Sequence, residues 1–257
     1  MTKRDWIRRV LLTLGILICL YPFASRAMVA IHDRIQIGEL RRDKADQEKR
    51  AAALAKLEGN KFAPAFTTKN LDKEMQQQVL GSITLPTLQV GMLLFDNISE
   101  DALNRGAGVL HGGSAPTGGR GTHAVISAHS GLPGKEFFSR LHKMKKGDRF
   151  VITVGERKLA YAVDAKFTVE PHDVSQLHID PNRDLVTLLT CTPVPLNTHR
   201  LLVRGHRVPY TAELSRAIEV AQRRSDWRNG VILVIVTLAL LGLLWLIWRR
   251  KKRQAVD

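Results

Sequence analysis

The stretch TLLTCTPVPLNTHRLLVRG, residues 187–205, contains two strand-like runs separated by a segment with two prolines and an asparagine. Such a pattern is typical of two β-strands joined by a loop. Cys191 ends the first run, and Arg200 begins the second. We therefore expect a thiol and a guanidinium at the rim of a β domain, where functional side chains are often placed.

Similar short runs, separated by Gly and Pro, fill the middle of the chain. They are VLGSITL (79–85), LQVGMLLF (88–95), THAVISAH (122–129), RFVITVG (149–155), KLAYAVDAKFTVE (158–170), LVTLLTC (185–191) and RLLVRGHRV (200–208). Seven or eight strands at this spacing predict a closed or sandwich-like β domain. Two short helices are expected within it, at residues 99–105, where Ser99 is the expected cap, and at residues 135–143.

Both ends of the chain are apolar. Residues 230–248 carry no charge and are long enough to cross a hydrocarbon core of about 30 Å as a helix. Residues 10–25 are also uncharged and fit either a signal peptide or a slightly short membrane anchor. Basic residues lie at the outer end of each segment, including RRKKR at 249–253, so the positive-inside rule predicts cytoplasmic termini and an external middle domain.

The net charge of +15 belongs largely to these membrane flanks. A basic chain often binds nucleic acid, but the basic clusters here have no aromatic residues suited to stacking on bases. We therefore expect the lipid bilayer as a partner and no nucleic acid.

The chain has two cysteines, and Cys19 lies inside the first apolar run. The external domain therefore has no disulfide framework, and Cys191 is a lone thiol facing an oxidising compartment. A free thiol is only a few per cent ionised near pH 7, so thiol chemistry needs an acid/base partner. His129, at the end of the run 122–129, is the candidate. Three strand ends would then supply a nucleophile, an acid/base and a cation.

Each of these residues also has an ordinary structural interpretation. A lone cysteine is usually a small core residue, and a histidine at a strand end usually lies on the surface. His206 is expected to be structural. The remaining histidines of the middle domain lack metal-ligand spacing, and the glycine-rich stretch 112–121 lacks the ending of a phosphate-binding loop. No cofactor or metal is expected.

The ordered motifs THAVISAHSGLP, TLLTC and NTHRLLVRG resemble the sortase family of cysteine transpeptidases, over about residues 81–208. TLLTCTP, HRLLVRGHR and the second membrane segment are similar to the class C, pilus-assembling branch. The resemblance implies a mainly β fold: a sortase-like closed barrel of about eight strands with short helices, flanked by membrane helices. It also implies that Cys191 is the nucleophile, His129 the acid/base and Arg200 the arginine. Arg204 competes for the last role, but the family's arginine precedes the LLVRG run.

The implied reaction is cleavage of an LPxTG-like sorting signal between Thr and Gly, through a thioester, at the surface of a Gram-positive cell. The acyl group would pass to an amine, for which a pilin lysine is favoured. Three alternatives stay open: attachment of surface proteins to a peptidoglycan amine, simple hydrolysis, and a non-catalytic membrane-anchored scaffold.

The sequence departs from the class C pattern at two places. The acidic-Pro-aromatic lid motif is absent, although NKFAPAF at 60–66 occupies a plausible place and Phe62 or Phe66 could plug the cleft. The family's common HRGLP reads HSGLP here, so Ser130 replaces a basic residue next to His129. We expect this change to alter substrate contacts and to leave the acid/base in place.

These patterns divide the chain into six parts. In order, they are a cytoplasmic flank with a membrane anchor or signal segment (1–31), a helical juxtamembrane segment with the candidate lid (32–69), the catalytic β-barrel (70–210), a helical linker (211–229), a transmembrane helix (230–248) and a basic cytoplasmic tail (249–257).

Overall fold

The computed structural model describes residues 3–40, 47–49, 51–52 and 79–254. Two compact units are present: Asp33–Gln222 form one, and Met1–His32 together with Arg223–Asp257 form the other. The candidate lid at 60–66 lies outside the described residues.

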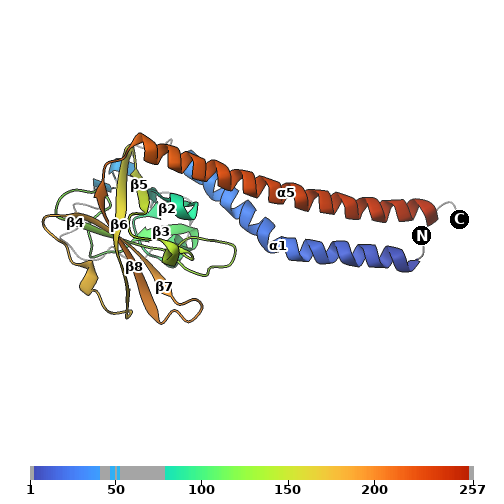
Figure 1. Ribbon diagram of the computed structural model, residues 1–257, viewed down its shortest axis with the longest axis horizontal. Helices are drawn as coiled ribbons and strands as arrows, with labels where there is room; N and C mark the ends of the chain where they lie inside the picture. The colour runs from blue at the N-terminus through green and yellow to red at the C-terminus, as the bar shows by residue number, and fades with distance from the viewer. Residues whose placement is uncertain (1–2, 41–46, 50, 53–78, 255–257) are drawn as a thin grey trace, which may run out of the picture. The chain divides into compact units, whose positions relative to one another are not determined.

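In the described part of Asp33–Gln222, eight strands close into a barrel in the order β1-β2-β3-β4-β7-β8-β6-β5 (Figure 1). Pairs β2–β3 and β4–β7 are parallel, and the other neighbours are antiparallel. The expected closed barrel is thus confirmed. The strands are β1 (Val79–Leu85), β2 (Val90–Phe95), β3 (Gly106–Val109), β4 (Thr122–Ser127), β5 (Arg149–Val154), β6 (Arg157–Val169), β7 (Asp184–Thr192) and β8 (His199–Val208).

Strand β3 has no counterpart among the expected runs. Its sequence, GAGV, is rich in residues that are depleted in strands. Its glycines are needed because the backbone passes very close to its neighbours. A Cβ at Gly108 would lie 2.0 Å from the carbonyl oxygen of Asn97, and one at Gly106 would lie 2.4 Å from that of Leu93. The glycines that this close packing requires have low strand propensity, so propensity does not predict β3.

One of the two expected short helices is confirmed. Helix α4 (Glu100–Arg105) begins after Ser99, whose hydroxyl accepts a hydrogen bond from the Ala102 N–H at 3.3 Å.

The helix expected at 135–143 is wrong, because only the 3₁₀ turn η2 (Leu141–Lys143) forms there. Phe137 has a φ of 28°, which no right-handed helix accepts. The other 3₁₀ turns among the described residues are η1 (Pro86–Leu88) and η3 (Ser175–Leu177).

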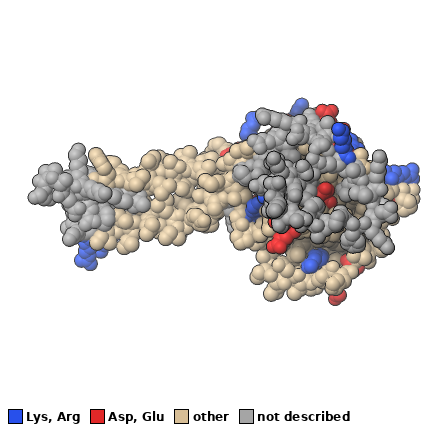
Figure 2. All heavy atoms as spheres, turned by 180° about the vertical axis from the view of Figure 1, so that it is seen from behind, with Lys and Arg blue, Asp and Glu red and all other residues tan. Residues whose placement is uncertain are grey.

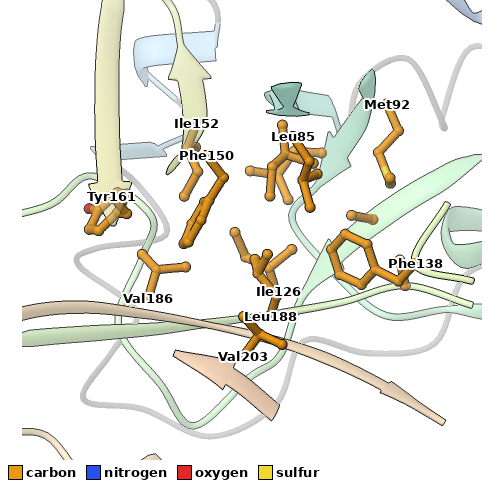
Figure 3. Packing of buried hydrophobic residues seen from close by; sticks show 14 of the residues in the cluster. Leu85, Met92, Ile126, Phe138, Phe150, Ile152, Tyr161, Val186, Leu188 and Val203 are labelled. Atoms are coloured by element: carbon orange, nitrogen blue, oxygen red, sulfur yellow. The ribbon is translucent and has the colours of Figure 1, made fainter. Parts of the chain in front are cut away.

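Alternation along the strands fills the barrel and decides which residues face outward. The inward set on the three strands near the candidate site is Ala124 and Ile126 of β4, Val186 and Leu188 of β7, and Leu201 and Val203 of β8. Figure 3 shows several of these side chains in the buried cluster, where the Phe150 and Tyr161 rings stack with centroids 5.6 Å apart. Residues between these positions point out of the barrel.

Two long helices complete the described structure: α1 (Lys3–Leu40) and α5 (Ala212–Gln254). Each contains a stretch long and apolar enough to cross a membrane, Val10–Val29 and Ala212–Gly242, the second overlapping the expected span 230–248. The described helical surface is almost uncharged over most of its length in Figure 2.

A short helical piece N-terminal to the barrel belongs to its core. Ala51 is fully buried in the main hydrophobic cluster, and the Gln47 side-chain oxygen accepts a hydrogen bond from the Gly155 N–H at 3.2 Å. At the other end of the barrel sequence, Leu214 in the first turn of α5 is buried against Val151 and Ala160. Parts of both flanking segments therefore contribute to the stability of the barrel unit.

The β1–β2 hairpin offers a matched pair of glycines for testing the barrel packing. A Cβ at Gly81 would lie 1.9 Å from the Thr153 carbonyl oxygen, whereas one at Gly91 would meet nothing closer than 3.8 Å. We expect Gly81→Ala to lower the free energy of unfolding by about 2 kcal/mol or more, because backbone of β5 must move. Gly91→Ala should change it by about 0.5 kcal/mol or less. Thermal unfolding in detergent measures both, and equal melting temperatures would contradict this packing.

Candidate active site

Cys191 and Arg200 are directly opposite each other in the antiparallel pair β7–β8. Residues paired in this way project from the same face, with Cβ atoms about 4.5–5.5 Å apart. The next pair is Thr190 with Leu201, and both of these side chains are buried. Since Leu201 belongs to the core, Cys191 and Arg200 lie on the outer face of the barrel, where both are partly exposed.

The parallel pair β4–β7 brings His129 to the same place. Its register matches Ser127 with Leu189, so two further steps along both chains put His129 beside Cys191. The two chains remain joined beyond the end of β4, because the Ala128 N–H donates to the Leu189 carbonyl at 3.2 Å. His129 is partly exposed, as Cys191 is. All three candidate residues from the sequence therefore meet at one end of three adjacent strands.

The two competing arginines have different surroundings. The Arg200 guanidinium donates from Nη1 to the carbonyl of Asn197 at 3.1 Å, in the loop after β7, and to that of His199 at 3.2 Å, at the start of β8. Arg204 instead forms an ion pair with Asp164, Nε to Oδ1 at 2.9 Å. Its cross-strand partner in β7 is Thr187. Only Arg200 thus shares a cross-strand pair with the thiol.

Asp164 is the centre of a cluster of cations on the outer face. It forms ion pairs with Arg183 and Arg204, and its Oδ2 lies 3.7 Å from Nδ1 of His206. Arg204 also lies over the Phe167 ring, at 5.5 Å from the centroid. The contact with Asp164 fits a structural role for His206. The Arg204 guanidinium is engaged by the Asp164 carboxylate and the Phe167 ring.

His123 is a residue whose role the sequence did not reveal. It is fully buried, with Nδ1 2.8 Å from the His178 carbonyl oxygen and Nε2 2.8 Å from the Thr187 hydroxyl. Because a carbonyl only accepts, Nδ1 carries the hydrogen, and Nε2 accepts from Thr187. The neutral ring thereby ties the loop between β6 and β7 to strand β7. The sequence offers one signal of a role near the site: side chains alternate along a strand, so His123 lies on the same face as His129.

Burial lowers the pKa of His123, and the positive charges of Arg204 and Arg183 lower it further. The hydrogen bond to the His178 carbonyl and the charge of Asp164 act in the opposite direction. Desolvation is the largest of these effects. As the pH falls, the ring in the folded protein therefore stays neutral at pH values where a free histidine already takes up a proton.

Within the described ranges, no three His, Cys, Asp or Glu side chains come together in a way that would hold a metal ion.

Comparison with known proteins shows the family to which this barrel domain belongs. The family model described as "Sortase domain" matches residues 83–208. The solved structure of a pilus-related sortase C from Group B Streptococcus is 40% identical, with a TM-score of 0.54, over 64% of this chain and 90% of that one. The chain belongs to the sortase family. Sortases are cysteine transpeptidases, and the structural similarity makes this one a sortase of the class C type.

Two other sortases show the same relationship. A Clostridium perfringens sortase C, solved with its C-terminal cell wall sorting motif, is 36% identical, with a TM-score of 0.54, over 66% of this chain and 91% of that one. Sortase A from Streptococcus agalactiae serotype III (strain NEM316) is 31% identical over 55% of this chain. The match spans 57% of that relative's length and 63% of a second curated relative's.

Because the pKa of His123 is lowered in the folded protein, stability is expected to depend on pH. Its pKa is lower in the folded state than the ordinary value of 6.5, so the unfolded chain binds the proton first as the pH falls. Stability is therefore lost as the pH drops below about 6.5, by about 1.4 kcal/mol for each unit of pKa difference. We expect the melting temperature of the sortase to fall more between pH 7.5 and pH 5 than that of His123→Gln.

The comparison uses the change with pH within each protein, because the substitution itself can lower stability at both pH values. An equal loss in the two proteins would show that His123 is not the group responsible.

Proposed function

We propose that this sortase is a cell-surface transpeptidase that cleaves an LPxTG-like sorting signal between Thr and Gly and joins the new carboxyl end to a pilin lysine. The proposal is supported by the position of three residues: Cys191 is directly opposite Arg200, and His129 lies two residues past the end of the neighbouring strand β4, next to the cysteine in register. These side-chain types at one partly exposed rim supply a nucleophile, a proton carrier and a fixed cation.

In the first half of the proposed reaction, the Cys191 thiolate attacks the Thr carbonyl carbon of the signal. The carbonyl electrons move to oxygen, giving a tetrahedral oxyanion. His129, as the imidazolium, then gives its proton to the glycine nitrogen as the Thr–Gly bond breaks. A Thr–Cys191 thioester remains, and the glycine fragment leaves with a neutral amine.

In the second half, the lysine amine attacks the thioester carbonyl and loses a proton to the neutral His129. The thiolate leaves, an isopeptide bond forms, and the enzyme returns to its starting protonation state. Only protons and an acyl group move, so the reaction calls for no metal or redox cofactor.

Arg200 is assigned to the oxyanion and to the adjacent substrate backbone. Arg200 is the cross-strand partner of Cys191, and the carbonyls of Asn197 and His199 hold its guanidinium, so its remaining donors are already oriented when the substrate arrives. Oriented donors of this kind contribute more to the transition state than donors that must first be ordered. Val194 and Leu196, which are 51% and 72% exposed in the same loop, offer apolar contacts to the signal.

The proposed location and acceptor are supported by the apolar segments with their basic flanks and by the relatives. We assign residues 70–210 to the catalytic barrel and residues 230–248 to a membrane crossing, with both basic termini in the cytoplasm and the barrel outside a Gram-positive cell. A pilin lysine is favoured as the acceptor because the Group B Streptococcus sortase C of the same fold is described as pilus-related. The Clostridium perfringens sortase C, solved with a sorting motif, supports the substrate class.

The test mixes the full chain in detergent micelles with an LPxTG peptide and one of three acceptors: a lysine-bearing pilin fragment, a peptidoglycan cross-bridge peptide, or water alone. Intact-mass spectrometry follows the enzyme and the products. We expect a thioacyl adduct on the wild-type enzyme, its absence in Cys191→Ala, and transfer of the acyl group to the pilin lysine.

Each other outcome selects a different function. Transfer to the cross-bridge amine and not to the pilin lysine would make this an anchoring sortase, and release of free acid with either amine present would make it a hydrolase. A panel of LPxTG-type peptides is then tested on the full chain and on a variant that lacks residues 60–66. If neither protein forms an adduct with any peptide, the remaining function is that of a membrane-anchored scaffold.

A further inference from the structure

The polypeptide between β4 and η2 leaves the regular β4–β7 ladder just before the histidine proposed as the acid/base. Strand β4 ends at Ser127, two residues before His129, whereas its partner β7 continues to Thr192. His129 thus lies beyond the last regular pair of the β4–β7 ladder, one residue past the Ala128 N–H that donates to the Leu189 carbonyl of β7. Other groups must hold this segment against the cysteine strand.

Two side-chain hydroxyls replace the missing ladder. The buried Thr190 hydroxyl donates to the Ala128 carbonyl at 2.8 Å, on one side of His129. The Ser130 hydroxyl donates to the Cys191 carbonyl at 2.6 Å, on the other side. The donor of the second bond is the neighbour of His129, and its acceptor is the backbone of Cys191 itself. This bond therefore joins the two proposed catalytic residues through one side chain.

The rest of the turn is fixed to other parts of the barrel. The His129 carbonyl accepts from the N–H of Phe138, whose ring is buried in the core, and the Gly131 N–H donates to the Ser139 hydroxyl at 2.9 Å. Gly131 has a φ of +73°, and a Cβ there would lie 2.6 Å from Val194 Cγ1 in the loop after Cys191. Of these described contacts, the Ser130 bond is the one that reaches the cysteine residue.

We propose that Ser130 is a positioning residue for the transfer reaction: its hydroxyl holds the His129 segment against the Cys191 backbone and so sets the separation of thiol and imidazole. The inference rests on the proposed function. A shift of about 1 Å in a reacting group can cost about 100-fold in rate. Because the hydroxyl is bonded within the protein, it acts on the rate of the chemical steps and not on substrate affinity.

The assignment belongs to this chain and not to the pattern that its sequence resembles. HSGLP stands here where the class C pattern commonly has HRGLP, so the sequence alone suggested only altered substrate contacts at position 130. The structure instead gives the hydroxyl a partner 61 residues away in β7, on the nucleophile's own carbonyl.

The experiment measures kcat and KM for acyl transfer from an LPxTG peptide by the full chain in detergent. We expect Ser130→Ala to lower kcat by about 10- to 100-fold with KM within about twofold of wild type. Ser130→Thr, which keeps a hydroxyl, should recover kcat to within about threefold. Ser139→Ala is the matched control, since that serine bonds the same turn at Gly131 but not Cys191, and it should stay within about threefold of wild type.

A second pair covers the case in which Ser130→Ala does not fold. Ser130→Thr and Ser130→Val differ by a hydroxyl and a methyl at nearly equal volume, and only the threonine variant should keep a high kcat. Wild-type kcat in Ser130→Ala or Ser130→Val, equal losses in Ser130→Ala and Ser139→Ala, or a change confined to KM would overturn the inference. If the wild-type enzyme forms no thioacyl adduct, the proposed function, on which the inference rests, would be overturned instead.

Discussion

The register between β7 and β8 is the constraint on which the candidate site depends. Alternation places Leu188 and Val203 in the core, and the same register puts Cys191 and Arg200 together on the outer face. A slip of one residue along β7 would turn the cysteine into the core and bring Thr190 out. The apolar packing of the barrel therefore specifies the active-site geometry as well as the stability of the fold.

The polar groups on the outer face divide into two sets with different tasks. Asp164 engages Arg183, Arg204 and His206, and the neutral His123 ties the β6–β7 loop to Thr187. These contacts stabilise the surface next to the site. Arg200 donates to the carbonyls of Asn197 and His199, and no carboxylate is among its described partners. In the proposed reaction, this charge would face the developing oxyanion.

Local patterns in the sequence predicted most of the barrel and singled out three candidate residues, whose catalytic roles are proposals. Apolar alternation marks strands such as Val79–Leu85, and Cys191, His129 and Arg200 each lie where a strand-like run meets a loop. Strand β3 was missed because close backbone contacts require its glycines, and the helix expected at 135–143 failed at the positive φ of Phe137. The partners of Ser130, His123 and Asp164 come from distant strands, so no local pattern encodes them.

The strand register pairs Arg200, and not Arg204, with Cys191, and we propose that Arg200 therefore acts with the thiol. The most direct measurement is the rate of thioacyl-enzyme formation from an LPxTG peptide in Arg200→Ala and Arg204→Ala, with melting temperatures recorded for both. We expect Arg200→Ala to be slower by about 100-fold or more at an unchanged melting temperature. Arg204→Ala should form the adduct within about fivefold of the wild-type rate and melt at a lower temperature, because Asp164 loses an ion-pair partner. A large loss of rate in Arg204→Ala, with Arg200→Ala still active, would contradict the account.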